Sequence, residues 1–275
     1  MIEPCMRKRR MIEPRVIELC FPAPPKPRMK KIGIVGGVSW LSTVEYYSQI
    51  CRQCEQHHLA SGLAGPPPIP EMTIESLDLS QTVAFLGAND DEASWSEFDE
   101  YHRAALLRLE ANGVDFALIA SNTPHHRFEA IVRGVEIPVL NMLHAVAIEC
   151  ARIGALRLLV LGTALTMSSS VFRREFARYG IAASGPEKQN VRSAVTELID
   201  DLQRGQFQHA AERLSAIVRA SLTPGAACPA VCLACTELPL AFPEQKILPS
   251  FELDGITYIN TTIVHANAAF DFALE

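Results

Sequence analysis

The sequence lacks long apolar runs and is modest in charge. No run of apolar residues approaches the ~18 needed to cross a bilayer, and the amino terminus has neither the apolar stretch nor the small-residue cleavage site of a secretory signal. Hydrophobic residues make up 48% of the chain and charged residues 20%, which is typical of a globular protein rather than a disordered or fibrous one. We therefore expect a cytoplasmic protein that does not contact a membrane.

Common nucleotide, hydrolase and metal motifs are also missing. Gly33, Gly36 and Gly37 do not form the G-x-G-x-x-G pattern of a dinucleotide site, and no G-x-S-x-G elbow of a serine hydrolase is present. The two C-x-x-C pairs, at 51–54 and 232–235, are far apart in the chain, and residues 232 and 235 of one strand would point to opposite faces. A structural zinc site is therefore disfavoured, and we expect neither a metal nor another cofactor.

Basic residues are scarce outside the amino-terminal segment. Residues 1–31 contain nine Lys or Arg and three Asp or Glu, whereas the remainder has 16 basic and 28 acidic residues, a net charge of -12. An acidic body of this kind argues against nucleic acid as a partner. The eight cysteines are expected to be reduced thiols, because a chain of 275 residues with a sizeable core needs no disulfide framework.

The order of patterns along the chain predicts an α/β fold. Residues 1–28 contain Met-Ile-Glu-Pro twice and end in a proline-rich stretch, so we predict a disordered or mobile extension. From residue 29 onward short apolar strands alternate with amphipathic helices, with strands predicted at 31–35, 115–120, 156–161 and 230–234. Capping signals predict helices entered through Ser42 and Ser94. Such alternation implies parallel sheets flanked by helices.

The two halves of the body resemble each other. Residues 32–37 have a counterpart in 158–163, and residues 117–123 have one in 231–237. We therefore predict two similar lobes, 29–141 and 142–275, related by a pseudo-twofold axis, with the last helix packing back on the first lobe. Because ligands bind at the carboxyl ends of parallel strands, Ser121 and Cys235 would face one cleft between the lobes.

Four segments in the same order resemble signature segments of the aspartate/glutamate racemase family, part of the Asp/Glu/hydantoin racemase superfamily. They are Gly-Gly-Val-Ser-Trp-Leu-Ser-Thr at 36–43, Ser-Asn-Thr-Pro-His at 121–125, Ala-Cys-Thr-Glu-Leu-Pro at 234–239 and Asn-Thr-Thr-Ile-Val-His at 260–265. The resemblance covers residues 29–275. It implies a cofactor-independent racemase of aspartate and/or glutamate, with a second copy of the chain as its expected partner in a homodimer.

In the family that this chain resembles, two cysteines flank the substrate Cα, and the second faces the proton of the L-enantiomer. Cys235 matches the second cysteine, and a thiol suits the task because its ordinary pKa near 8.5 is open to tuning. Ser121 stands where the family usually has the first cysteine, which resembles the subgroup with a hydroxyl residue there. A hydroxyl is a poor unaided base, so Ser121 needs activation or a relay through water, His125 or His126.

Short polar residues beside these two positions are predicted to hold the substrate carboxylate through side chains and backbone N–H groups. This predicted set is Val38, Ser39, Asn122, Thr123 and Thr236. Glu237 either orients and tunes the Cys235 thiol or is a carboxylate favoured by a helix amino terminus.

A cation for the distal carboxylate of an acidic substrate is hard to find. No Lys or Arg occurs between Arg52 and Arg103, the region in which the family often places one. Lys188 and Arg192 are substitutes, unless both are merely solvated helix charges.

Two other functions fit the same residues. Relatives of the arylmalonate decarboxylase type keep only the second-half cysteine and protonate an enediolate on one face, so a single-cysteine decarboxylase or isomerase is one alternative. A catalytically silent ligand-binding homologue, in which Ser121 has ended turnover, is the other.

Overall fold

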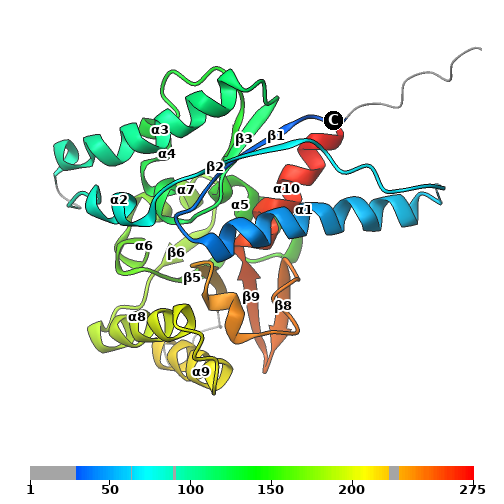
Figure 1. The fold of residues 1–275 in the computed structure, drawn as a ribbon. Helices are drawn as coiled ribbons and strands as arrows, with labels where there is room; N and C mark the ends of the chain where they lie inside the picture. Colours follow the sequence, from blue (N-terminus) through cyan, green and yellow to red (C-terminus); the bar gives the residue numbers. More distant parts are fainter. Residues whose placement is uncertain (1–28, 63, 89–90, 223–228) are drawn as a thin grey trace, which may run out of the picture.

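A computed structural model describes residues 29–62, 64–88, 91–222 and 229–275 (Figure 1). The extension predicted at 1–28 lies outside the described residues. In the part that is described, no helix is long and apolar enough to cross a membrane.

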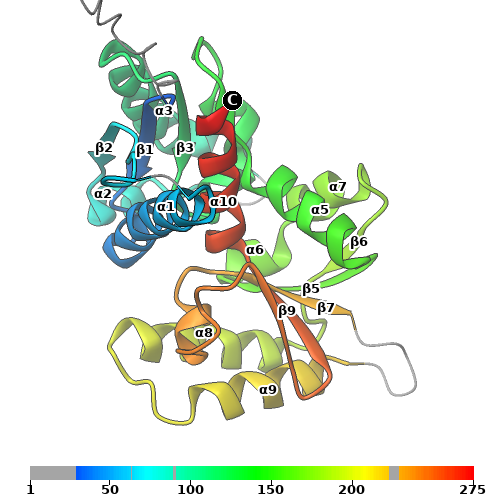
Figure 2. The same cartoon turned by 90° about the vertical axis from the view of Figure 1, so that its right-hand side faces the viewer.

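Two separate sheets form the framework of the molecule, and each is flanked by helices (Figures 1 and 2). The first has the order β2-β1-β3-β4 and is parallel throughout. The second has the order β6-β5-β7-β9-β8. Their strands are β1 (Ile32–Gly36), β2 (Met72–Ser76), β3 (Phe116–Ile119), β4 (Val139–Leu140), β5 (Arg157–Gly162), β6 (Ala182–Ser184), β7 (Ala230–Ala234), β8 (Ser250–Leu253) and β9 (Ile256–Asn260). The predicted α/β fold with helix-flanked parallel sheets is confirmed.

One strand departs from the parallel pattern. Strand β8 pairs antiparallel with β9, and Leu253 lies opposite Ile256. The two residues between them, Asp254 and Gly255, both have positive φ (51° and 73°), as a two-residue hairpin turn requires. The Asp-Gly dipeptide was therefore a readable hairpin signal.

The helices cover both faces of each sheet. Helices α1 and α10 lie together on one side of the first sheet and α3 on the other, while α8 and α9 cover the outer face of the second sheet (Figure 2). The α-helices are α1 (Trp40–Ala60), α2 (Leu79–Ala84), α3 (Ser96–Ala111), α4 (Phe128–Ile131), α5 (Met142–Ile153), α6 (Ala164–Ser168), α7 (Ser170–Ala177), α8 (Gln189–Gln203), α9 (Ala210–Ser221) and α10 (Thr261–Leu274).

The last helix, α10, contacts α1 of the first lobe. The Gln49 amide donates to Asn267 Oδ1 (2.8 Å), and the Tyr46 hydroxyl is 2.9 Å from His265 Nδ1. A single apolar cluster continues from the first sheet through α10 to the second sheet. The boundary at residues 141 and 142 stays a prediction.

The start of α1 differs from the predicted one. The helix begins at Trp40, and its cap is Ser39, whose side chain accepts from Ser42 N (3.4 Å). Ser42 itself lies inside the first turn, where its hydroxyl donates to the carbonyl of Ala120 (2.6 Å). The spacing alone does not distinguish the two positions, because Ser39 and Ser42 are both capping residue types.

The helix predicted to enter through Ser94 is also shifted. A short 3₁₀ turn, Glu92–Trp95, precedes α3, and its cap is the Asp91 side chain, which accepts from the backbone N of Ala93 (3.0 Å) and Ser94 (3.3 Å). Ser94 instead accepts from Ala88 N (2.8 Å). Aspartate competes well for the cap position, so the local pattern did not decide between the two.

Candidate active site

The first turn of α1 connects the carboxyl ends of two strands from different sheets. Ser42 Oγ donates to the carbonyl of Ala120, directly after β3. Ser39 Oγ donates to Glu237 Oε1 (3.0 Å), shortly after β7. Ser121 follows Ala120, and Cys235 directly follows β7, so both predicted catalytic residues adjoin segments that contact the amino terminus of the same helix.

The Cys235 thiol is buried and hydrogen-bonded to a carboxylate. Its side chain is 6% exposed, and Sγ donates to Glu237 Oε2 (3.0 Å). Burial raises the pKa of Cys235 well above its ordinary value, and the charge and hydrogen bond of Glu237 raise it further. The Cys235 thiol is therefore held in its protonated form, and Glu237 Oε2 is the oxygen to which that proton points.

Glu237 gathers three donors although it is almost fully buried (4% exposed). The hydroxyls of Ser39 and Thr236 and the Cys235 thiol all donate to it, each at 3.0 Å. The positive end of the α1 dipole also attracts its charge. Glu237 precedes the 3₁₀ helix Leu238–Ala241, but its side chain makes no capping bond there. These contacts favour the first of the two predicted roles, in which Glu237 orients and tunes the thiol.

Glu237→Gln should lower the pKa of Cys235, because a neutral amide removes the negative charge that opposes thiolate formation. The rate at which a small alkylating reagent modifies Cys235, followed by peptide mass spectrometry across pH, should rise at lower pH than in the unaltered protein. Thr236→Val is the matched control, because it removes a neighbouring donor but keeps the carboxylate. An unchanged alkylation profile in Glu237→Gln would contradict the coupling.

The turn that carries Ser121 is held firmly. Ser121 N donates to the carbonyl of Ile119 (2.9 Å), and the carbonyl of Ser121 accepts from His125 Nδ1 (2.9 Å). The Ser121 side chain is 8% exposed, and no hydrogen bond joins its hydroxyl to another of the residues described. The hydroxyl is therefore available to a substrate or to water.

Neither predicted histidine relay contacts that hydroxyl. A carbonyl oxygen can only accept, so His125 carries its proton on Nδ1, and burial lowers its pKa to about 4. His126 Nδ1 lies 2.8 Å from Ser169 Oγ instead. Of the relays considered for Ser121, water is the one compatible with these contacts.

The Asn122 side chain has unused hydrogen-bonding groups that a ligand could satisfy. Its side chain is 4% exposed, yet neither the amide oxygen nor the amide nitrogen has a hydrogen-bond partner within the described part of the chain. An unsatisfied buried amide is costly, by about 1–3 kcal/mol per group. A bound molecule with both a donor and an acceptor would remove that cost.

The remaining predicted substrate-binding residues lie around these groups. Thr123 opens the 3₁₀ helix Thr123–Arg127 directly after Asn122, and Thr236 is half-buried beside the Cys235 thiol. Val38 packs against the apolar cluster of the first lobe and leads into Ser39.

Tyr46 and His265 form a buried pair that the sequence patterns did not assign to the site, and this pair supports the turn that carries Ser121. His265 Nε2 bonds the carbonyl of Leu140 (3.1 Å), so its Nδ1 accepts from the Tyr46 hydroxyl. The rings of His265 and His125 are 5.5 Å apart. The sequence singles out residues 260–265 only by their resemblance to the family segment. No neighbouring residue in the sequence indicates that His265 contacts α1 and β4.

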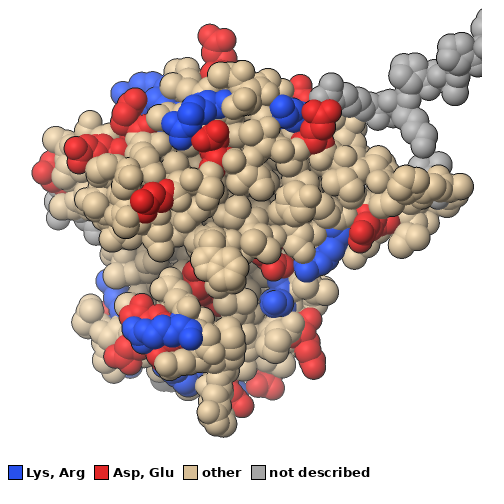
Figure 3. Space-filling model, viewed as in Figure 1, with Lys and Arg blue, Asp and Glu red and all other residues tan. Residues whose placement is uncertain are grey.

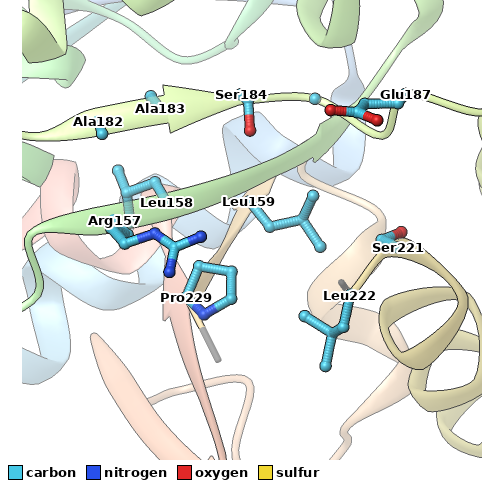
Figure 4. Close-up of a pocket in the computed structure, with 11 residues that line it drawn as sticks. Arg157, Leu158, Leu159, Ala182, Ala183, Ser184, Glu187, Ser221, Leu222 and Pro229 are labelled. Carbon is cyan, nitrogen blue, oxygen red and sulfur yellow. The ribbon is translucent and has the colours of Figure 1, made fainter. Parts of the chain in front are cut away.

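A pocket of about 250 Å³ lies away from these residues (Figure 4). It is near the starts of β5 and β6, where Arg157, Ser184 and Glu187 are among the lining residues. Leu222 and Pro229, which flank a segment outside the described residues, also line it. It contains none of the predicted site residues, and the chemistry points to the strand ends instead.

Comparisons with known proteins show which family the chain resembles. The family model for Asp/Glu/Hydantoin racemase matches residues 35–269. The broad specificity amino-acid racemase RacX of Bacillus subtilis is 26% identical over 182 residues, which are 65% of this chain and 74% of RacX. A candidate Asp/Glu racemase from Yersinia pestis has a similar structure (TM-score 0.73, 23% identity, 90% of this chain and 100% of that chain). An aspartate racemase homologue from Pyrococcus horikoshii OT3 has a TM-score of 0.69 at 24% identity, again over 90% of this chain and 100% of the other.

Proposed function

Because the chain belongs to the Asp/Glu/hydantoin racemase family of pyridoxal-independent isomerases, we propose that it is an amino-acid racemase in which Cys235 and Ser121 serve opposite faces of the substrate Cα. The observation that carries the proposal is the hydrogen-bonded contact of Cys235, Glu237 and Ser39, since it couples the thiol to a proton acceptor at the junction of the two strand ends.

Proton transfer follows from those contacts. The Cys235 thiol gives its proton to Glu237, and the resulting thiolate takes the Cα proton of an L-amino acid. The Ser121 hydroxyl then gives a proton to the opposite face of the carbanion while it takes one from water, and Glu237 returns its proton through water to the hydroxide left behind. The reverse sequence converts the D-enantiomer, and no step needs an oxidant or a reductant.

The substrate's amino and carboxylate groups have fitting partners. The unpaired Asn122 amide offers one donor and one acceptor. Thr123, Thr236 and Ser39 add hydroxyls and backbone N–H groups, and the Val38 backbone borders the same turn. Charge-assisted hydrogen bonds of this kind orient a carboxylate well.

Aspartate and glutamate are the substrates that the resemblance implies, and Arg192 is the cation proposed to hold their distal carboxylate. Arg192 is half-buried, its Nε donates to the carbonyl of Pro186 (2.6 Å), and it forms no ion pair with any described residue. It lines a groove of about 420 Å³ between α6 and α8. Ala164 in that groove directly follows Thr163 at the end of β5, the strand beside β7.

Arg192→Met should raise KM for aspartate and glutamate by about 10-fold or more, because a charge-assisted bond to a carboxylate is lost. Turnover of alanine, which has no distal carboxylate, should change little. Lys188→Met is the matched control, since Lys188 is an exposed cation one residue before the same helix. Equal losses for acidic and neutral amino acids would remove Arg192 from this role.

Deuterium exchange tests the proposed function. L- and D-forms of aspartate, glutamate and a set of neutral amino acids are incubated with the protein in deuterated water. Exchange at Cα with inversion supports the racemase. Exchange with retention alone indicates a one-base partial reaction, and no exchange with any amino acid contradicts the proposal.

The decarboxylase alternative is favoured by one feature, the absence of a second cysteine opposite Cys235. In that reaction Cys235 would protonate an enediolate after loss of carbon dioxide, and Ser121 would transfer no proton. Release of carbon dioxide from an arylmalonate, with no Cα exchange of amino acids, would select it over the racemase.

A further inference from the structure

We propose that Thr262, in the first turn of α10, donates a hydrogen bond to the α-carboxylate of the substrate, and that the positive end of α10 stabilises the negative charge that develops there when the Cα proton leaves. The proposed racemase activity is the premise, and Thr262 adds a binding group to the same site.

The Thr262 hydroxyl is buried and unpaired. The side chain is 2% exposed, and within the described part of the chain Oγ1 has no hydrogen-bond partner. Threonine hydroxyls inside helices commonly donate to the carbonyl four residues earlier, but Thr262 makes no such bond. Buried hydroxyls are rarely left unpaired, so the expected partner of this one is a bound molecule.

The rest of this helix turn is well bonded. The Thr261 hydroxyl donates to the carbonyl of Leu233 (3.0 Å). The Asn260 side chain caps α10 by accepting from the backbone N of Thr262 (3.1 Å) and of Ile263 (3.4 Å). The unpaired Thr262 hydroxyl is therefore not the result of a frayed helix end.

The first turn of α10 lies beside the segment that carries Cys235. Strands β7 and β9 are parallel neighbours, with Leu233 opposite Asn260. Two residues further along the two segments are Cys235 and Thr262. Figures 1 and 2 show that α10 starts where β9 ends, at this edge of the second sheet. Thr262 therefore belongs to the same group of strand ends as Cys235.

The same face of α10 reaches the turn that carries Ser121. His265 lies about one helix turn after Thr262, so the two side chains share a face. The ring of His265 is 5.5 Å from the ring of His125, whose Nδ1 donates to the carbonyl of Ser121 (2.9 Å). Thr262 is consequently placed between the two residues proposed to serve opposite faces of Cα, where a carboxylate attached to that carbon would lie.

A hydrogen bond at this carboxylate would assist the chemical step. When the Cys235 thiolate takes the Cα proton, the electron pair of the broken bond moves toward the carboxylate, whose oxygens gain negative charge. A hydroxyl fixed at one of these oxygens binds it more strongly in the transition state than in the bound substrate. Thr262 would therefore lower the barrier as well as hold the substrate.

Cationic side chains are scarce around this position. Among the described residues no Lys or Arg is buried, and on the face shown in Figure 3 Lys and Arg are scattered among Asp and Glu. Glu237 adds a buried carboxylate beside Cys235. Stabilisation of the new charge must therefore come from hydrogen bonds and dipoles. Helix α10 has 14 residues, and its amino terminus carries the partial positive charge that this requires.

Thr262→Val and Thr262→Ser test the inference, because valine has the shape of threonine without the hydroxyl, whereas serine keeps the hydroxyl. Thr262→Val should melt no lower than the unaltered protein, since no internal partner of the hydroxyl is left unpaired. Its dissociation constants for L-aspartate and L-alanine, measured from the rise in melting temperature with amino-acid concentration, should both increase by about 10-fold or more, because both ligands carry the α-carboxylate. Cα deuterium exchange should fall by at least the same factor, and Thr262→Ser should restore binding and exchange.

Thr261→Val is the matched control, because Thr261 is equally buried but its hydroxyl is bonded to Leu233. It should lower the melting temperature and leave both dissociation constants close to those of the unaltered protein. Unchanged dissociation constants in Thr262→Val would overturn the inference, as would an unaltered protein that binds neither amino acid. If the unaltered protein bound both through Thr262 but exchanged no Cα proton, the racemase proposal would fail while the carboxylate contact would stand.

Discussion

Cys235→Ala is expected to lower Cα deuterium exchange of L-amino acids by at least about 100-fold, the lower end of the contribution of a positioned general base. The buried thiol is the group that is hydrogen-bonded to Glu237, and its removal leaves no base of comparable strength at the end of β7. Glu237 remains, but its oxygens are held by Ser39 and Thr236. The measurement is wash-in of deuterium at Cα, followed by mass spectrometry.

Cys232→Ala is the control for that experiment. Cys232 lies on β7, three residues before Cys235, and is 1% exposed, and burial raises its pKa as well. Its side chain packs in the cluster of α5 and α10, whereas Cys235 packs in the cluster of α8 and α9. Thermal melting of both variants separates lost stability from lost chemistry. Exchange at the unaltered rate in Cys235→Ala would remove this residue from the proposed mechanism.

The features that were predictable from the sequence are those decided locally. Strand β7 was predicted at 230–234 and is observed at Ala230–Ala234. The prediction succeeded because the short apolar run ends where the polar residues Thr236 and Glu237 begin. Gly113 follows the end of α3 with φ of +68°, a conformation that glycine favours after a helix, so the end of this helix is also decided locally. Cap positions were less predictable, because several capping residue types occur within a few residues of each other.

Only part of the candidate site could be predicted from the sequence, because its other features depend on contacts between residues far apart in the chain. Cys235 and Ser121 stand out by resemblance and by residue type. The bond from Ser39 to Glu237 joins residues 198 positions apart, and nothing near either residue records it. The unpaired Asn122 amide likewise emerges only when its surroundings are packed, because burial without a partner is a property of the fold.

His265 could not be assigned from the sequence for the same reason, because its contacts lie far from it along the chain. Its imidazole reaches both Tyr46 on α1 and the carbonyl of Leu140 after α10 has packed back on the first lobe. Burial lowers the pKa of His265 to about 3, so the ring is neutral at physiological pH. A neutral ring in that place braces the Ser121 turn rather than titrating.

Ser121→Cys is expected to raise Cα exchange of D-amino acids, and Ser121→Ala is expected to abolish it. The pKa of a hydroxyl, near that of water, lies about seven units above that of a thiol, so deprotonation of the hydroxyl costs roughly 10 kcal/mol more. Within the described structure no hydrogen bond assists the Ser121 hydroxyl. A thiol at this position lowers the cost of deprotonation, although the larger sulfur must fit at a residue that is only 8% exposed.

The two enantiomers make the Ser121 experiment decisive. Racemisation has an equilibrium constant of one, so kcat/KM for inversion must change equally from both sides. Exchange of the L-form with retention needs only Cys235, and it should therefore survive in Ser121→Ala, whereas exchange of the D-form should not. In Ser121→Cys, D-form exchange and inversion should rise together. If instead Ser121→Ala exchanged the D-form as well as the unaltered protein does, the proton on that face would have to come from another group, and the proposed role of Ser121 would be wrong.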